Sequence, residues 1–181
     1  MKNKLILLLA VLFLCSAFKA DKPVITIFMI GDSTMANKSL TGGNPERGWG
    51  HVLPGFFSED IQVDNHAMNG RSSKSFINEG RWDKVLSLIK KGDYVFIQFG
   101  HNDEKLSAER HTDPGTTFDA NLRKFVNETR AKGGIPVLFN SIVRRKFGTS
   151  NDKAVAEAGS GNVQRIPLCA RYPPLCGSAA S

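Results

Sequence analysis

The chain has 181 residues, a length typical of one domain that can bury a hydrophobic core. Apolar residues make up 41% and charged residues 23%, ordinary globular usage that favours neither a disordered, a fibrous nor a membrane protein. The formal charge is +7, but basic residues do not form runs interleaved with aromatics, so we expect no nucleic-acid partner.

Residues 1–20 resemble a secretory signal peptide. A basic start precedes an uncharged apolar run at residues 5–14, and small residues follow, with cleavage expected after Ala17 or Ala20. The run is shorter than the about 20 residues that a membrane-spanning helix needs. We therefore expect a secreted or periplasmic protein with no membrane attachment after cleavage. The alternatives are an uncleaved N-terminal helix and lipid attachment at Cys15.

Four short apolar runs predict buried strands, and three of them end in loops of glycine and polar residues. The predicted strands lie at residues 24–30, 61–65, 94–99 and 137–142. The three loops are Gly31-Asp32-Ser33-Thr34-Met35, Asn69-Gly70-Arg71-Ser72-Ser73 and Gly100-His101-Asn102-Asp103. In a parallel sheet, ligands bind beyond the carboxyl ends of the strands, so these loops predict one shared site.

Helical patterns separate the predicted strands. Apolar residues from Trp82 to Ile89 are spaced for one helix face and stop before Gly92. The second pattern covers residues 117–132 and places four apolar residues inward: Phe118, Leu122, Phe125 and Val126. Strands alternating with helices predict parallel pairing through right-handed crossovers. The predicted fold is therefore α/β, a three-layer α/β/α sandwich.

The composition changes near the end of the chain. Residues 148–181 are rich in glycine, alanine, serine and proline and show neither helical nor strand periodicity, so they predict an irregular tail. The predicted domain, residues 21–147, would lack its last strand and C-terminal helix, because four strands leave an edge and an apolar face uncovered. Cys169 and Cys176 could pair in an oxidising compartment.

The three loops hold the groups that acyl transfer by a serine requires. Ser33 offers a hydroxyl for attack on an acyl carbonyl carbon. The backbone N–H groups of Ser33 and Gly70 and the side-chain amide of Asn102 could donate to the carbonyl oxygen as it becomes negative. Gly70 has no side chain to keep a substrate away from its N–H.

Other polar and aromatic residues near these loops have two interpretations each. His101 is a candidate for substrate binding, and a structural hydrogen bond is the alternative. Asp32 and Asp103 are expected to fix their loops by local hydrogen bonding. Trp49 and Trp82 could stack on sugar rings, but core or helix-face packing is the more common role.

The motifs in these loops resemble a known family. Gly31-Asp32-Ser33, Gly70 and Gly100-His101-Asn102-Asp103 match, in order, three sequence blocks of the SGNH (GDSL-like) hydrolases, and the longer motifs are similar to the rhamnogalacturonan acetylesterase group. The resemblance covers residues 24–147. It implies a flavodoxin-like sheet and a secreted serine esterase that removes O-acetyl groups from pectic polysaccharide without a cofactor. Acetylated polysaccharide or oligosaccharide is the implied partner.

The Asp-x-x-His pair that supplies the base in this family does not occur in the chain. Its four histidines are preceded, three positions earlier, by Gly48, Val63, Gln98 and Ala108. The chain looks truncated or shifted out of frame after about Phe147, so we expect an impaired or inactive esterase. The alternative is a non-catalytic glycan-binding module that retains the cleft. No spacing predicts a metal site, and no glycine-rich phosphate loop follows the first strand.

Overall fold

The computed structural model describes residues 24–142, 147–150 and 153–156. The predicted signal peptide and most of the predicted tail lie outside these residues. The main sheet has four strands, in the order β2-β1-β3-β4. They are β1 (Ile25–Gly31), β2 (Ile61–Asn65), β3 (Tyr94–Gln98) and β4 (Ile135–Leu138). All three neighbouring pairs are parallel, which confirms the predicted pairing. This is the order of the first four strands of a flavodoxin-like sheet.

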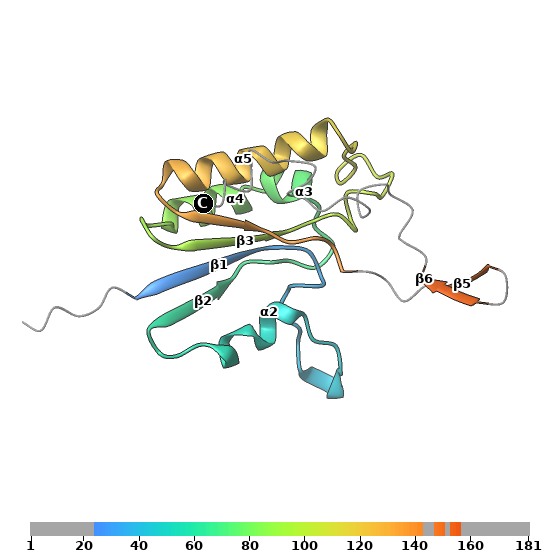
Figure 1. Ribbon diagram of the computed structural model, residues 1–181, viewed down its shortest axis with the longest axis horizontal. Coiled ribbons are helices and arrows are strands. Elements are labelled where there is room, and N and C mark those ends of the chain that lie inside the picture. Colours follow the sequence, from blue (N-terminus) through green and yellow to red (C-terminus); the bar gives the residue numbers. More distant parts are fainter. Residues whose placement is uncertain (1–23, 143–146, 151–152, 157–181) are drawn as a thin grey trace, which may run out of the picture.

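Three helices cover one face of this sheet (Figure 1). They are α3 (Ser73–Asn78), α4 (Arg81–Leu88) and α5 (Thr117–Ala131). The four apolar residues predicted for the inner face of α5 are all buried here, against Phe28 and Ile30 of β1. Helix α5 ends two residues before Gly133, whose φ is a positive 77°, as predicted. Helix α4 ends earlier than predicted, at Leu88, and Gly92, with a φ of 93°, follows four residues later. The predictions of α4 and α5 are therefore confirmed.

Among the described residues, the opposite face of the sheet carries only short helices, α2 (Trp49–Val52) and η2 (Leu53–Phe56), near β1 and β2. A further short helix, η1 (Thr41–Gly43), precedes them. Ile27 and Met29 of β1 point to this face, because successive side chains of a strand alternate between the two faces. Helices thus lie on both sides of the sheet, but the second helical layer is thinner than the sequence predicts.

Two elements of the main sheet and its helices, β4 and α3, differ from the predictions. The strand predicted at 137–142 is β4 and runs from residue 135 to 138. It includes Pro136 because β4 is an edge strand of the described sheet, where a missing N–H is tolerated. It ends early because its partner β3 ends at Gln98. Helix α3 is not predicted by apolar spacing; a capping box between Ser72 and Ser75 begins it.

We predicted that residues 148–181 form neither strand nor helix. This prediction is wrong for the part of that segment that the structure describes. There β5 (Phe147–Ser150) pairs with β6 (Lys153–Ala156) in an antiparallel sheet of its own. The overlooked signal is the Asn151-Asp152 dipeptide between them, since both residue types favour tight turns. The predicted absence of a last strand and C-terminal helix concerns residues outside the described part.

Candidate active site

The three predicted loops meet at the carboxyl edge of the main sheet. In the parallel register, Gly31 at the end of β1 lies beside Gln98 at the end of β3, and Met29 lies beside Asn65 at the end of β2. The N–H of Met68, directly before the second loop, donates to the Gly31 carbonyl at 3.0 Å. The loops that follow β1 and β2 are therefore joined directly, as the parallel topology predicts.

Asp32 shapes the turn that carries Ser33. Its Oδ1 accepts hydrogen bonds from the N–H of Thr34 at 2.9 Å and from the Thr34 hydroxyl at 2.8 Å. Its backbone carbonyl accepts from the N–H groups of Met35 and Ala36. The predicted local role of Asp32 is confirmed. Ser33 itself is only half-buried, so its side chain lies at the surface of this turn.

Gly70 lies in the second loop with its backbone open on the side where a side chain would stand. Its φ is 76°, and a Cβ added there would meet no heavy atom within 4 Å. The positive φ is a left-handed conformation that glycine adopts more easily than other residues. A side chain at this position would therefore meet no neighbour, and the approach of a substrate to the Gly70 N–H stays a prediction.

Asn102 connects the third loop to the second. It is buried, and its Nδ2 donates to the carbonyl oxygen of Arg71 at 3.1 Å, directly after Gly70. A side-chain amide has two N–H donors, so this contact uses one of them. The structure therefore brings Asn102 beside the Gly70 loop, and Ser33 follows the strand between them. The catalytic roles of Ser33, Gly70 and Asn102 stay predictions.

Asp103 does not act locally, contrary to the prediction. Its Oδ1 accepts from the Ser73 N–H at 3.0 Å, the Ser73 hydroxyl at 2.5 Å and the Thr112 hydroxyl at 2.9 Å. Asn121 of α5 donates in turn to the Ser73 hydroxyl. Asp103 thus fixes the start of α3 to the third loop. An aspartate after a strand can bond equally well to nearby backbone groups, so the sequence did not predict the distant partner Ser73.

Burial also changes the acidity of Asp103. The side chain is 3% exposed, and loss of solvation raises its pKa from 3.8 to about 6, although the hydrogen bonds from Ser73 and Thr112 oppose the shift. The negative charge of Asp32 adds a smaller increase. The carboxyl group of Asp103 therefore changes charge in the mildly acidic range.

His101 is buried between protein groups. Its Nε2 lies 2.8 Å from the carbonyl oxygen of Ile142, and its Nδ1 lies 3.9 Å from Oδ2 of Asp32. That Asp32 oxygen is buried and has no hydrogen-bond partner among the described residues. These contacts favour a structural hydrogen bond as the role of His101. Substrate binding by His101 stays a prediction.

Gln98 is a supporting residue that sequence reasoning missed. Its Oε1 accepts from the indole N–H of Trp49 at 2.7 Å and lies 3.0 Å from the hydroxyl of Thr34, whose single proton it shares with Oδ1 of Asp32. Its Nε2 donates to the carbonyl of Asn140. A glutamine at the end of an otherwise apolar strand was the available signal. Gln98 fixes the Ser33 turn to β3.

The two tryptophans have packing roles. The ring of Trp49 packs against Phe139 at a centroid distance of 5.2 Å, and Trp82 is fully buried against Phe125. The indole N–H of Trp82 donates to Glu128. Both side chains therefore have packing contacts, the more common role, and sugar stacking by the half-buried Trp49 stays a prediction.

Within the described ranges, no group of three metal-ligating side chains occurs. The same residues contain no helix long and apolar enough to cross a membrane.

Comparison with known proteins places the chain in a class of hydrolases. It belongs to the GDSL-like Lipase/Acylhydrolase family, a family of serine esterases and acylhydrolases, whose model matches residues 29–173. The match continues past residue 147, where the resemblance was expected to end. The family assignment itself is confirmed.

Particular relatives narrow the comparison. The chain is 43% identical to the rhamnogalacturonan acetylesterase RhgT of Bacillus subtilis over 126 residues, 70% of this chain and 53% of that protein. It is 40% identical to a rhamnogalacturonan acetylesterase of Emericella nidulans over 78 residues, 43% of this chain and 28% of that protein. The crystal structure of YxiM from Bacillus subtilis superposes with a TM-score of 0.57 at 32% identity, covering 64% of this chain and 32% of that one. The chain spans about half the length of RhgT.

Proposed function

We propose that this protein is a carbohydrate O-acetylesterase of the SGNH type, with Ser33 as its nucleophile. The observation that carries the proposal is the hydrogen bond from Asn102 to the carbonyl of Arg71, because it brings two predicted oxyanion donors, Gly70 and Asn102, to one place. The printed function of the relatives RhgT and the Emericella enzyme supports acetylated rhamnogalacturonan as the substrate. Such a substrate fits a secreted or periplasmic location, which the first 20 residues favour.

In the proposed reaction, Oγ of Ser33 attacks the acetyl carbonyl carbon. The carbonyl oxygen becomes negative and accepts from the N–H groups of Ser33 and Gly70 and from Nδ2 of Asn102. The bond to the sugar oxygen then breaks, and that oxygen leaves with a proton. Water hydrolyses the acetyl-serine, releases acetate and restores the hydroxyl. No step requires a cofactor.

Both half-reactions need a base to remove a proton, from Ser33 and then from water. No histidine of this sequence stands in an Asp-x-x-His pair. Loss of the histidine from a serine triad costs about a million-fold in turnover in the best-studied protease. We therefore expect very slow hydrolysis by the 181-residue polypeptide.

The test supplies the base from solution. The chain and its Ser33→Ala variant are incubated with acetylated rhamnogalacturonan oligosaccharide, with and without imidazole, and acetate is measured by NMR. We expect imidazole to increase acetate release more with the unaltered chain than with Ser33→Ala. Ser87→Ala, an exposed serine on α4, is the matched control and should behave like the unaltered chain. Equal release by all three proteins would refute a nucleophilic Ser33.

Because no Asp-x-x-His pair occurs in this sequence to supply the general base, a second function is a glycan-binding module that does not hydrolyse its ligand. The same incubation distinguishes the two. A chain that binds the acetylated oligosaccharide, while its acetate release does not depend on Ser33 even with imidazole, is a binding module.

A further inference from the structure

The turn before α3 exposes an asparagine directly before Gly70. Asn69 is exposed, and Asn69-Gly70 is the only asparagine–glycine pair in the sequence. In such a pair, the backbone nitrogen of the glycine can attack the side-chain carbonyl carbon of the asparagine and close a five-membered ring. Glycine favours this attack because it has no Cβ to hinder its nitrogen.

The backbone nitrogen of Gly70 is available for this attack. Among the described residues, no group accepts a hydrogen bond from its N–H. Gly70 and Arg71 also line a surface cavity of about 330 Å³, which gives water and dissolved base access to the turn. The nitrogen therefore does not have to break a protein contact before it reacts.

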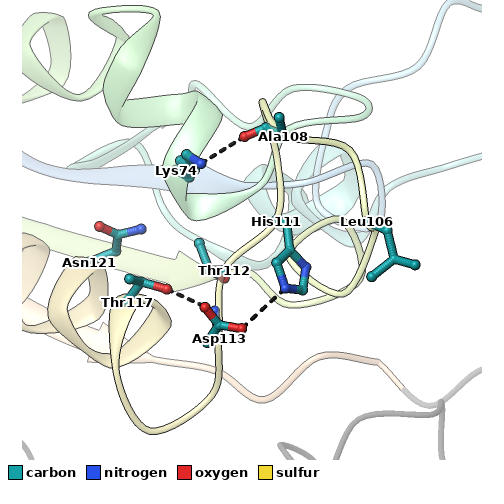
Figure 2. A pocket seen from close by; sticks show the side chains of 8 residues that line it. All are labelled: Lys74, Leu106, Ala108, His111, Thr112, Asp113, Thr117 and Asn121. Carbon is teal, nitrogen blue, oxygen red and sulfur yellow. Dashed lines mark hydrogen bonds and ion pairs between the residues drawn. The ribbon is translucent and has the colours of Figure 1, made fainter.

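The fold holds this cavity in place. Glu109 and Arg110 form another part of its lining. Their segment is fixed to α3, because the ammonium group of Lys74 donates to the backbone carbonyl of Ala108 at 2.7 Å (Figure 2). The cavity beside Gly70 is therefore a feature of the fold rather than a gap between two independent loops.

A cation contacts the amide that would be attacked. The ammonium group of Lys38 donates to Oδ1 of Asn69 at 2.8 Å. Attack by the Gly70 nitrogen makes this oxygen negative, so the charged donor stabilises the tetrahedral intermediate. The Lys38 side chain is only 10% exposed, and its ion pair with the exposed Glu46 is long, at 3.9 Å. Its charge is therefore directed chiefly at the Asn69 amide.

Both ends of the turn are fixed to the other two loops of the candidate active site. The N–H of Met68 donates to the carbonyl of Gly31, and the carbonyl of Arg71 accepts from Asn102. The N–H of Arg71 closes the turn on the carbonyl of Met68 at 3.3 Å. A change in backbone length between these two anchors would therefore displace the Gly70 N–H.

We propose that Asn69-Gly70 is a self-modification site, at which deamidation of Asn69 disables the loop of Gly70. The Gly70 nitrogen loses its proton to base and forms a bond to Cγ of Asn69. The Cγ–Nδ2 bond then breaks, and Nδ2 takes up a proton and leaves as ammonia. Water opens the succinimide at either carbonyl, which leaves aspartate or isoaspartate at position 69 and restores the Gly70 N–H. The base is regenerated, so water is the only co-reactant.

Both products act against the predicted oxyanion donors. Isoaspartate adds one carbon to the backbone between Met68 and Arg71 and so shifts the Gly70 N–H. Aspartate places a negative charge directly before Gly70, where it repels the charge that develops on a substrate carbonyl. This effect on the esterase rests on the proposed function, whereas the deamidation itself does not.

The test follows position 69 by mass spectrometry. The folded chain is incubated at mildly alkaline pH in H₂¹⁸O, digested with pepsin at acidic pH and analysed by tandem mass spectrometry. We expect ¹⁸O to enter position 69. Asn65 and the exposed Asn127 of α5 are internal controls and should stay unlabelled, because neither precedes a glycine.

Three variants test the mechanism. Asn69→Gln should abolish labelling at position 69, because its longer side chain must close a less favourable six-membered ring. Lys38→Gln keeps an N–H donor for Asn69 but removes the charge, and should slow labelling about two- to fivefold, the effect of one charge pair. Lys84→Gln, an exposed lysine on α4, is the matched control and should leave the rate unchanged.

Two results would overturn the proposal. The first is labelling of position 69 in the chain unfolded in urea but not in the folded chain, because the turn would then protect Asn69. The second is labelling of the folded chain at Asn127 as fast as at Asn69. An unchanged rate in Lys38→Gln would overturn the role of Lys38.

Activity separates this inference from the proposed function. Fresh and aged samples of the unaltered chain and of Asn69→Gln are compared in the imidazole assay, each with its own fresh sample. We expect Ser33-dependent acetate release to fall with age only in the unaltered chain. Labelling of position 69 without such release from fresh samples leaves the modification and removes the esterase. Release that survives complete deamidation leaves the esterase and overturns the effect on the Gly70 loop.

Discussion

Replacing Asp103 with asparagine should remove a pH dependence from the stability of the fold. The aspartate carboxyl is buried, and its pKa in the folded chain is about 6 against 3.8 for a solvated aspartate. The folded state therefore binds the Asp103 proton more tightly than the unfolded state does. The stabilisation from this proton is complete below about pH 4 and is lost as the pH rises through 6.

The size of the effect follows from the shift. A difference of about two pKa units at 1.36 kcal/mol per unit amounts to about 3 kcal/mol. An asparagine can keep the bonds to Ser73 and Thr112, because Oδ1 of Asp103 accepts from both and an amide oxygen can take its place. The variant should differ from the unaltered chain chiefly in its lack of a titrating group. Because pH 4 is already close to the unfolded pKa, the unaltered chain should lose about 2.4 kcal/mol of this amount relative to Asp103→Asn between pH 4 and pH 7.

Urea unfolding followed by tryptophan fluorescence measures this difference at several pH values. Trp82 is fully buried, so its emission should report the loss of the core. Asp83→Asn, an exposed aspartate on α4, controls for the removal of a carboxylate from the surface. The reasoning is refuted if the stability difference between the unaltered chain and Asp103→Asn is the same at pH 4 and pH 7, or if Asp83→Asn produces the same trend.

Four further substitutions test the packing around the site. Ser72→Ala removes the cap of α3 and should cost about 1 kcal/mol, measured as a lower thermal midpoint; no change would show that the capping box does not stabilise the helix. Gly48→Ala should destabilise the fold by about 1–3 kcal/mol or prevent folding, because the added Cβ would lie 2.1 Å from the carbonyl oxygen of Ala36. Gly70→Ala should cost only about 1–2 kcal/mol, because its Cβ would point into open space and only the φ of 76° is unfavourable. The reverse ranking of these two variants in urea unfolding would contradict the structure. Trp82→Phe keeps an aromatic ring against Phe125 but removes the hydrogen bond to a carboxylate, and should cost about 1.5–3 kcal/mol in the same assay; a neutral result would mean that this bond adds nothing to stability.

Local patterns in the sequence were sufficient for much of the fold. Helix α5 was predictable because Phe118, Leu122, Phe125 and Val126 recur at helical spacing before a glycine stop. Strand β2 was predicted at its observed bounds because its run is short and ends in polar residues. Strand β4 and the β5–β6 hairpin were placed less well, because a strand boundary depends on where the neighbouring strand stops and on turns that apolar spacing does not report.

The candidate site divides in the same way. Ser33, Gly70 and Asn102 could be singled out from the sequence because each follows a strand in a parallel sheet, and all such ends lie at one edge. The sequence alone thus determined the family, the parallel sheet and the edge where chemistry is expected. Only the tertiary structure decided that Asp103 binds Ser73 and that His101 faces Ile142 and Asp32. Those contacts join residues 30 to 69 positions apart, which is beyond the reach of any local sequence pattern.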